Sequence, residues 1–167
     1  MAKAIALVSA LCILALATLA QGHPTNLAEG HLSNVFNVTG KVYCDPCRVQ
    51  FQNQFSRNVP GATVKLSCSN IDTKVLTYSV EGVTDNTGYY NLLVTGDHEN
   101  DICEVVVVKS PEPDCSEKMS EVESSRIEIT ENSGMHSDVR FANPIGLMTK
   151  DTLPECVAVE NFDKDDD

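Results

Sequence analysis

Apolar and polar side chains alternate with a period of two through the middle of the chain, and this pattern constrains the fold more than any other feature. The alternation is regular in residues 62–68, 75–83 and 88–94, and it places every second side chain on one face of a β-strand. Residues 101–110 (DICEVVVVKS) are richer in β-branched side chains, as expected of a strand covered on both faces, and RIEIT (126–130) adds a further alternating segment. Clusters of Gly, Pro, Asn and Asp separate the segments. Several short strands without helical patterns between them predict an all-β sandwich or barrel.

The same alternation groups the side chains that share one face of each predicted strand. These are Val64, Leu66 and Cys68, then Leu76, Tyr78 and Val80, then Tyr90, Leu92 and Val94, and finally Ile127 and Ile129.

Three segments, GKV (40–42), PGATVKL (60–66) and TDNTGYYNL (84–92), resemble the transthyretin-like or carboxypeptidase-regulatory-like sandwich. In the last segment the Asp85 side chain is suited to closing a tight turn, and Gly88 to adopting a positive φ. We therefore expect an antiparallel β-sandwich or barrel of about seven strands. Such a resemblance concerns the fold and carries no chemistry.

The first 22 residues have the pattern of a secretory signal peptide. Lys3 gives a short positive start, the run Ala4–Ala20 carries no charge, and Ala20 and Gly22 offer small residues for cleavage. A signal anchor is the alternative, but no basic stop-transfer cluster follows the apolar run. We expect a signal peptide at 1–22, cleaved after residue 20 or 22, and no membrane span afterwards. A single β domain at 23–159 and an acidic C-terminal tail at 160–167 would follow, in an extracellular, secreted protein.

Acidic residues outnumber basic ones twofold. The chain has 24 Asp and Glu against 12 Lys and Arg, a formal net charge of −12 at pH 7. A charge of this sign opposes binding to nucleic acid and electrostatic docking to anionic lipid. We expect neither kind of partner.

Six cysteines remain once Cys12 is removed with the signal peptide. An even number of cysteines in an oxidising compartment points to three disulfides, which six cysteines can form in any of fifteen pairings. They are Cys44, Cys47, Cys68, Cys103, Cys115 and Cys156. Asn37-Val38-Thr39 is the one Asn-x-Ser/Thr triplet of the chain and predicts an N-glycan at Asn37.

The pair in Cys44-Asp45-Pro46-Cys47 has three interpretations. A thioredoxin-like enzyme needs a thiolate stabilised by a helix N-terminus or by cations, and Asp45 opposes that stabilisation although Arg48 partly offsets it. A zinc site needs a second ligand pair at suitable spacing, which neither the other cysteines nor the scattered histidines provide. The third interpretation, two anchors for two separate disulfides, agrees best with an all-β chain that has four further cysteines.

Seven segments along the chain carry a resemblance to a known family: TGKVYCDPCR (39–48), PGATVKLSC (60–68), TDNTGYY (84–90), DHENDICEVVVVKSP (97–111), DCSE (114–117), RFANPIGL (140–147) and LPEC (153–156). With these segments the chain resembles the Ole e I family of secreted plant pollen proteins, named for the olive major allergen. Within the family it looks most like the grass group XI, goosefoot-type and tomato anther-specific members.

The resemblance implies a disulfide pattern and a role. Its pairing of first to fifth, second to sixth and third to fourth cysteine corresponds here to Cys44–Cys115, Cys47–Cys156 and Cys68–Cys103. Family members are extracellular, often glycosylated and expressed mainly in pollen. Some act as ligands of receptor kinases in pollen hydration and tube growth, and many are recognised by human IgE. The olive prototype's glycan site falls near Asn132-Ser133-Gly134, which lacks the required hydroxyl residue here, so the glycan is expected on Asn37 instead.

No motif of a familiar enzyme class is present in the chain. The sequence contains no Gly-x-Ser-x-Gly elbow, no His-Glu-x-x-His and no phosphate-binding Gly-rich loop. We therefore expect a non-enzymatic protein that needs no cofactor or metal and acts through an extracellular protein partner, such as a pollen receptor-kinase ectodomain. The alternatives are a polysaccharide-binding cell-wall module, disfavoured by the absence of Trp, and a Cys-x-x-Cys thiol-disulfide enzyme. A protease inhibitor with SPEPD (110–114) as its exposed loop is a third alternative.

Overall fold

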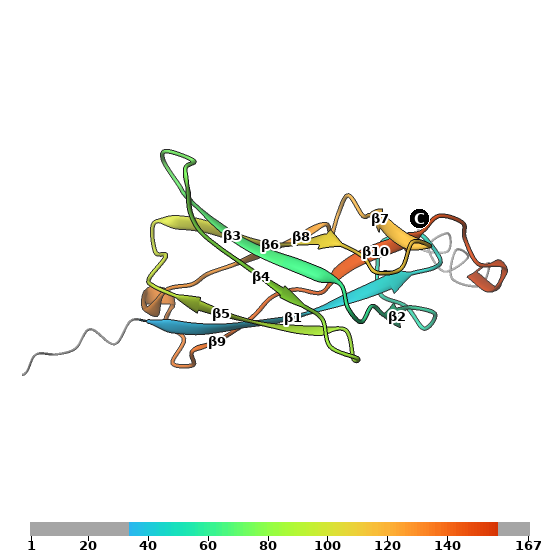
Figure 1. The fold of residues 1–167 in the computed structure, drawn as a ribbon, viewed down its shortest axis with the longest axis horizontal. Helices are drawn as coiled ribbons and strands as arrows, with labels where there is room; N and C mark the ends of the chain where they lie inside the picture. Colours follow the sequence, from blue (N-terminus) through green and yellow to red (C-terminus); the bar gives the residue numbers. More distant parts are fainter. Residues whose placement is uncertain (1–33, 157–167) are drawn as a thin grey trace, which may run out of the picture. The chain divides into compact units, whose positions relative to one another are not determined.

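The computed structural model describes residues 34–156 (Figure 1). The expected signal peptide at 1–22 and acidic tail at 160–167 lie outside the described residues. Within the described part, the regular elements are ten strands and two short 3-10 turns, with no α-helix. The strands are β1 (Val35–Asp45), β2 (Arg57–Asn58), β3 (Thr63–Asn70), β4 (Leu76–Val83), β5 (Tyr89–Thr95), β6 (Asp101–Lys109), β7 (Cys115–Lys118), β8 (Ser124–Ile127), β9 (Val139–Phe141) and β10 (Ile145–Thr149). The 3-10 turns are η1 (Glu131–Ser133) and η2 (Pro154–Cys156).

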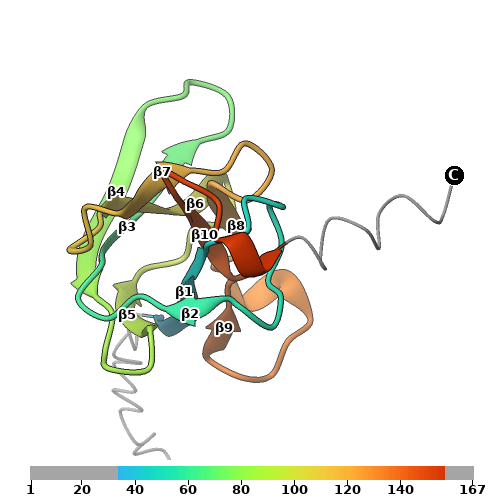
Figure 2. The same cartoon turned by 90° about the vertical axis from the view of Figure 1, so that its right-hand side faces the viewer.

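The strands form two sheets that face each other, as Figures 1 and 2 show. One sheet has the order β4-β3-β6-β8, and all its pairings are antiparallel. The other is organised by the long strand β1. The first half of β1 pairs with β5 and β9, and its second half pairs with β2 and β10, beyond which lies β7. The all-β sandwich expected from the alternating pattern is confirmed, and the sheets do not close into a barrel.

The core lies between the two sheets and follows the predicted alternation. On β3 the side chains of Val64, Leu66 and Cys68 are fully buried, and on β5 those of Tyr90, Leu92 and Val94 are buried against them. These inward positions are confirmed. Because alternate residues of β1 also point inward, the core is continuous from β1 and β5 across to β3 and β6.

Three details differ from the sequence expectation. Ten strands replace about seven, because β2, β7 and β9 have four residues or fewer and are too short to show a period. The pairings of β1 with β9 and β10 are parallel, whereas an antiparallel sandwich was expected. The outer face of β6 is only partly buried rather than covered, and β8 ends at Ile127, so the buried Ile129 follows the strand instead of belonging to it.

The turn before β5 has the predicted chemistry. The Asp85 carboxylate accepts hydrogen bonds from the backbone N–H of Thr87 at 2.8 Å and of Tyr89 at 3.1 Å. Gly88 has φ +77°, and a Cβ there would lie 2.8 Å from the carbonyl oxygen of Val42. Glycine is therefore required at this position by both the backbone conformation and the close approach of β1.

No helix in the described residues is long and apolar enough to cross a membrane.

Candidate functional site

The two cysteines of the Cys-x-x-Cys motif lie at the end of β1, and each forms a disulfide with a different distant segment. Cys44 is bonded to Cys115 at the start of β7, and Cys47 is bonded to Cys156 in η2. These four cysteines are all buried, with at most 2% of any one exposed. The pairing is the one that the family resemblance implies. We call the segment 44–56 together with these two disulfides the cysteine hub.

Asp45 is the organising residue of the hub. Its side chain is fully buried, and its carboxylate accepts hydrogen bonds from the backbone N–H of Cys47 and of Gln50, both at 2.9 Å. The side-chain amide of Asn53 donates to the same carboxylate at 3.3 Å. A buried carboxylate is tolerated when it has several such donors. Asp45 therefore folds the loop that follows the motif.

The backbone of this loop is not helical. Residues 47–56 form turns and bends, and Arg48 and Gln50 adopt positive φ values of 57° and 64°. Within residues 34–156, no helix N-terminus lies at either motif cysteine. The hub thus lacks the features that activate a thiolate, since neither motif sulfur is free and no helix supports it.

Arg48 ties the hub to β7 and β10, which belong to the same sheet as β1. Its guanidinium forms an ion pair with Glu117 of β7 at 2.6 Å and donates a hydrogen bond to the backbone carbonyl of Thr149 in β10. The arginine after the second cysteine is therefore engaged in a structural contact. Its positive charge pairs with the Glu117 carboxylate and is not used to stabilise a cysteine thiolate.

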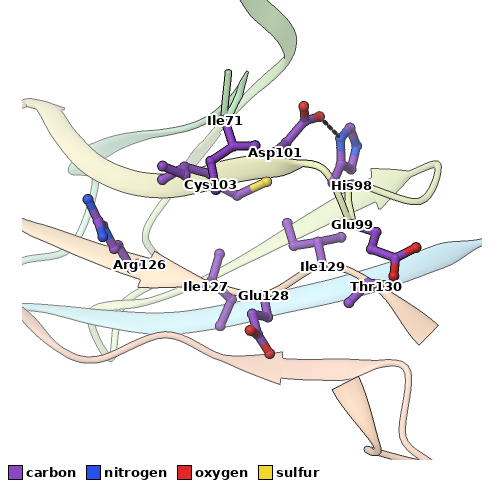
Figure 3. Close-up of a pocket in the computed structure, with 11 residues that line it drawn as sticks. Ile71, His98, Glu99, Asp101, Cys103, Arg126, Ile127, Glu128, Ile129 and Thr130 are labelled. Atoms are coloured by element: carbon purple, nitrogen blue, oxygen red, sulfur yellow. Dashed lines mark hydrogen bonds and ion pairs between the residues drawn. The ribbon is translucent and has the colours of Figure 1, made fainter. Parts of the chain in front are cut away.

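The third disulfide, Cys68–Cys103, joins directly paired residues of β3 and β6. It borders a hollow of about 410 Å³ whose lining includes His98, Asp101 and Glu128 (Figure 3). Nδ1 of His98 lies 2.9 Å from Asp101 Oδ2, whereas the buried Nε2 has no hydrogen-bond partner. Burial opposes ionisation of Asp101, but hydrogen bonds from Thr77 and His98 and the charge of His98 hold the pKa of its carboxyl below the usual 3.8.

This hollow contains one group of potential metal ligands within the described part of the chain. The Sγ atoms of Cys68 and Cys103 and a ring nitrogen of His98 lie within 4.8 Å of one another. Zinc and copper bind cysteine as the thiolate, and both sulfurs are bonded to each other here. The group therefore does not fit a metal while the disulfide is intact.

Asn37, the predicted glycosylation residue, lies in the first half of β1 with its side chain partly exposed. The inward neighbours Phe36 and Val38 are buried, so Asn37 faces outward on the sheet side opposite the core. Asn132, at the alternative position, lies in η1, which ends at Gly134 with φ +75°.

Arg140 is a structural residue that sequence reasoning did not single out. Only 1% of it is exposed, its guanidinium lies 4.7 Å from the ring centre of Phe36, and it donates hydrogen bonds to the backbone carbonyls of Thr130 (2.8 Å) and Ser137. These contacts hold the 130–137 loop against the core, although Nε of Arg140 is buried without a hydrogen-bond partner. The segment RFANPIGL, in which it lies, was the one sequence feature that could have drawn attention to it. Because Arg140 stands between the apolar residues Val139 and Phe141, alternation predicts that it faces solvent.

The comparisons with known proteins agree with this arrangement. The chain matches the family described as "Pollen protein Ole e 1 like" over residues 34–163, which includes the cysteine hub and both sheets. This chain belongs to the Ole e 1-like pollen protein family.

Two relatives match this chain over more than nine-tenths of its length. It is 57% identical to the anther-specific protein LAT52 of Solanum lycopersicum over 93% of this chain and 91% of that protein. It is 47% identical to the pollen allergen Che a 1 of Chenopodium album over 92% of this chain and 88% of that allergen. The crystal structure of the major plantain pollen allergen Pla l 1 is similar, with a TM-score of 0.66 and 36% identity over 73% of this chain and 99% of that one. None of these names denotes an enzymatic activity, and the three disulfides are consistent with secretion.

Proposed function

We propose that this chain is a secreted, non-enzymatic pollen glycoprotein that acts as an extracellular ligand in pollen hydration and pollen tube growth. The observation that carries the proposal is membership of the Ole e 1-like family, with relatives named as anther-specific and pollen proteins. The cysteine hub supports its non-enzymatic part. The residues that resembled a redox motif are buried in two disulfides and a carboxylate-centred loop.

The proposed partner is the ectodomain of a pollen receptor kinase. The test is a pull-down of ectodomains from pollen-tube membranes with oxidised, glycosylated protein immobilised through a C-terminal tag. Protein that has been reduced and alkylated serves as the control, because it has the same sequence and charge without the three disulfides. Capture by the oxidised protein alone supports the proposal. Repeated failure of the oxidised protein to capture any ectodomain would refute the ligand role.

Two alternative functions are tested with the same preparation. A thiol-disulfide enzyme would reduce insulin in the presence of a dithiol, and we expect no activity above that of the dithiol alone. A polysaccharide-binding module would be retained by pectin or by a glycan array, and we expect no retention.

We further propose that the protein binds IgE of sensitised people, since relatives such as Che a 1 are named as pollen allergens. Disulfides in a compact all-β protein keep conformational epitopes intact. The measurement is inhibition of IgE binding to a related pollen extract by the oxidised protein. Inhibition should fall strongly after reduction and alkylation, and absence of inhibition would contradict this part of the proposal.

A further inference from the structure

One surface of the sandwich is both apolar and exposed. It is the side of strands β5, β1 and β9 that faces away from the core; Figures 1 and 2 show these three strands side by side. We call this surface the outer face. It comprises Val35, Asn37, Thr39 and Lys41 of β1, Tyr89, Asn91 and Leu93 of β5, and Val139 and Phe141 of β9.

Phe141 and Leu93 of the outer face are the two most exposed large apolar side chains of the described residues. Phe141 is 78% exposed, Leu93 is 63% exposed and Tyr89 is 50% exposed. They come from two strands on opposite sides of β1, and the outward residues of β1 between them, Asn37, Thr39 and Lys41, are polar. The outer face therefore exposes large apolar side chains on both sides of a polar row, and an exposed surface of this kind indicates one that is covered in use.

Asn37 lies in the middle of the outer face. The strand register places it directly between Leu93 of β5 and Val139 of β9. Thr39, two residues further along the same face, is paired with Phe141. Because neighbouring strands are about 4.8 Å apart, the first sugar on Asn37 would lie over these apolar side chains.

A hollow lies further along the same face and begins at Thr39, the next outward residue of β1 after Asn37. It has a volume of about 330 Å³, and its lining includes Thr39, Lys41, Gln52, Tyr89 and Phe141. The ring of Phe141 offers flat apolar surface and the amide of Gln52 offers hydrogen bonds, while the Lys41 ammonium lies 5.7 Å from the centre of the Tyr89 ring. This is a combination that suits a neutral sugar with an apolar ring face and polar substituents.

We propose that the outer face is the docking surface of the protein's own Asn37 glycan, whose core N-acetylglucosamine residues pack over Leu93 and Phe141 and reach the adjoining hollow. The proposal rests on the glycosylation stated in the proposed function and adds where the glycan lies and what it covers. A glycan attached in the middle of the outer face would have to be displaced before a second copy of this chain or another macromolecule could dock flat on it. The attached glycan is therefore the occupant that this position favours.

The test measures side-chain accessibility by hydroxyl-radical footprinting of the protein secreted from plant cells. Four samples are compared: wild type, Asn37→Gln, Thr39→Ser, and folded wild type from which an amidase has removed the glycan. Thr39→Ser is the matched control because it keeps the glycosylation triplet. The amidase-treated sample removes the sugar without requiring a variant to fold. Leu153, 44% exposed and outside the outer face, is the internal reference.

We expect glycopeptide analysis to find Asn37 occupied in wild type and in Thr39→Ser. Labelling of Leu93 and Phe141, relative to Leu153, should rise several-fold in Asn37→Gln and in the amidase-treated protein. Binding of an apolar dye such as bis-ANS should rise in the same two samples.

Three results would overturn the proposal. They are an unoccupied Asn37, an occupied Asn37 with unchanged labelling of Leu93 and Phe141 after glycan removal, and protection of these residues only when wild type dimerises or binds pectin or a receptor ectodomain. Failure of the ligand role in the pull-down leaves the footprinting result unaffected, so the two proposals can fail separately.

Discussion

Gly40 of β1 lies directly opposite Tyr90 of β5, and the two residues share a space that holds only one side chain. A Cβ on residue 40 would overlap the Tyr90 hydroxyl and lie 2.5 Å from Cζ of its ring. The Tyr90 hydroxyl is buried without a hydrogen-bond partner, and burial raises the pKa of the phenol well above 10.0. The glycine of the GKV segment therefore makes room for a core aromatic ring.

Gly40→Ala should lower the free energy of unfolding by about 2 kcal/mol, the typical cost of forcing an extra methyl group into a packed core. Urea denaturation of the oxidised protein measures this cost. The matched background is Tyr90→Leu, which removes the ring. In that background Gly40→Ala should cost markedly less, and an equal cost in both backgrounds would contradict a steric explanation.

Asp45 supplies the second prediction at this scale. Asp45→Ala should lower the free energy of unfolding by about 3 kcal/mol, because it leaves the buried N–H groups of Cys47 and Gln50 unpaired. Asp45→Asn retains one acceptor oxygen and should cost less. Chemical denaturation gives both values, and equal stability of all three proteins would show that the carboxylate does not organise the hub.

At the scale of the elements, β3 and β5 were predictable because each is long enough to show alternation and has one buried face. Strand β6 was predicted from its β-branched residues, although the expected covering of both its faces was wrong. Strand β4 was predicted from the same period, yet Leu76 at its start is 56% exposed because β4 is an edge strand. The short strands β7 and β9 could not be predicted. They exist because β1 offers hydrogen-bond partners to β9 and β10 offers them to β7, a tertiary effect that leaves no local pattern.

The candidate site was predictable to a similar extent. The family resemblance gave a reason to assign Cys44 and Cys47 to two different disulfides. Glycosylation of Asn37 was predicted from its Asn-x-Thr triplet. The contribution of Asp45 was not predictable, because an acidic residue between two cysteines is equally compatible with a surface loop. The apolar outer face around Asn37 depends on the registers of β5 and β9 against β1, which no local sequence pattern specifies.

The contacts around β6 lead to a prediction on pH. Asp101 at the start of β6 accepts hydrogen bonds from Thr77 of β4 and His98, so its folded pKa lies below 3.8. A lowered carboxyl pKa stabilises the fold above the unfolded value, and this contribution is lost as the pH falls below 3.8 through the folded pKa. Stability measured by thermal unfolding should therefore decrease between pH 4 and lower values.

Asp101→Asn is the matched variant for this prediction, since it keeps the shape and cannot ionise. Its stability should be lower at neutral pH, and its loss of stability below about pH 4 should be shallower than that of wild type. Parallel acid profiles for the two proteins would show that Asp101 does not contribute to the pH dependence.

At the scale of the whole molecule, the cysteine hub connects the end of β1 with two segments distant in sequence. Its disulfides span 71 and 109 residues, and each closed loop of this size stabilises the fold by about 4 kcal/mol in the chain-entropy estimate. The Cys-x-x-Cys motif, which resembles a redox site, therefore joins the end of β1 to both distant segments through disulfides. Both cysteines thus have a structural role, and this role favours a recognition protein over an enzyme.

The most direct test of this structural role is a peptide map of the oxidised protein without reduction. Trypsin leaves both motif cysteines in one peptide, 42–48, and mild acid cleaves its Asp45–Pro46 bond and separates them. We expect the fragment with Cys44 to be linked to the peptide containing Cys115, and the fragment with Cys47 to the peptide containing Cys156. A disulfide joining the two fragments to each other would contradict this structural role and restore the thiol-disulfide enzyme.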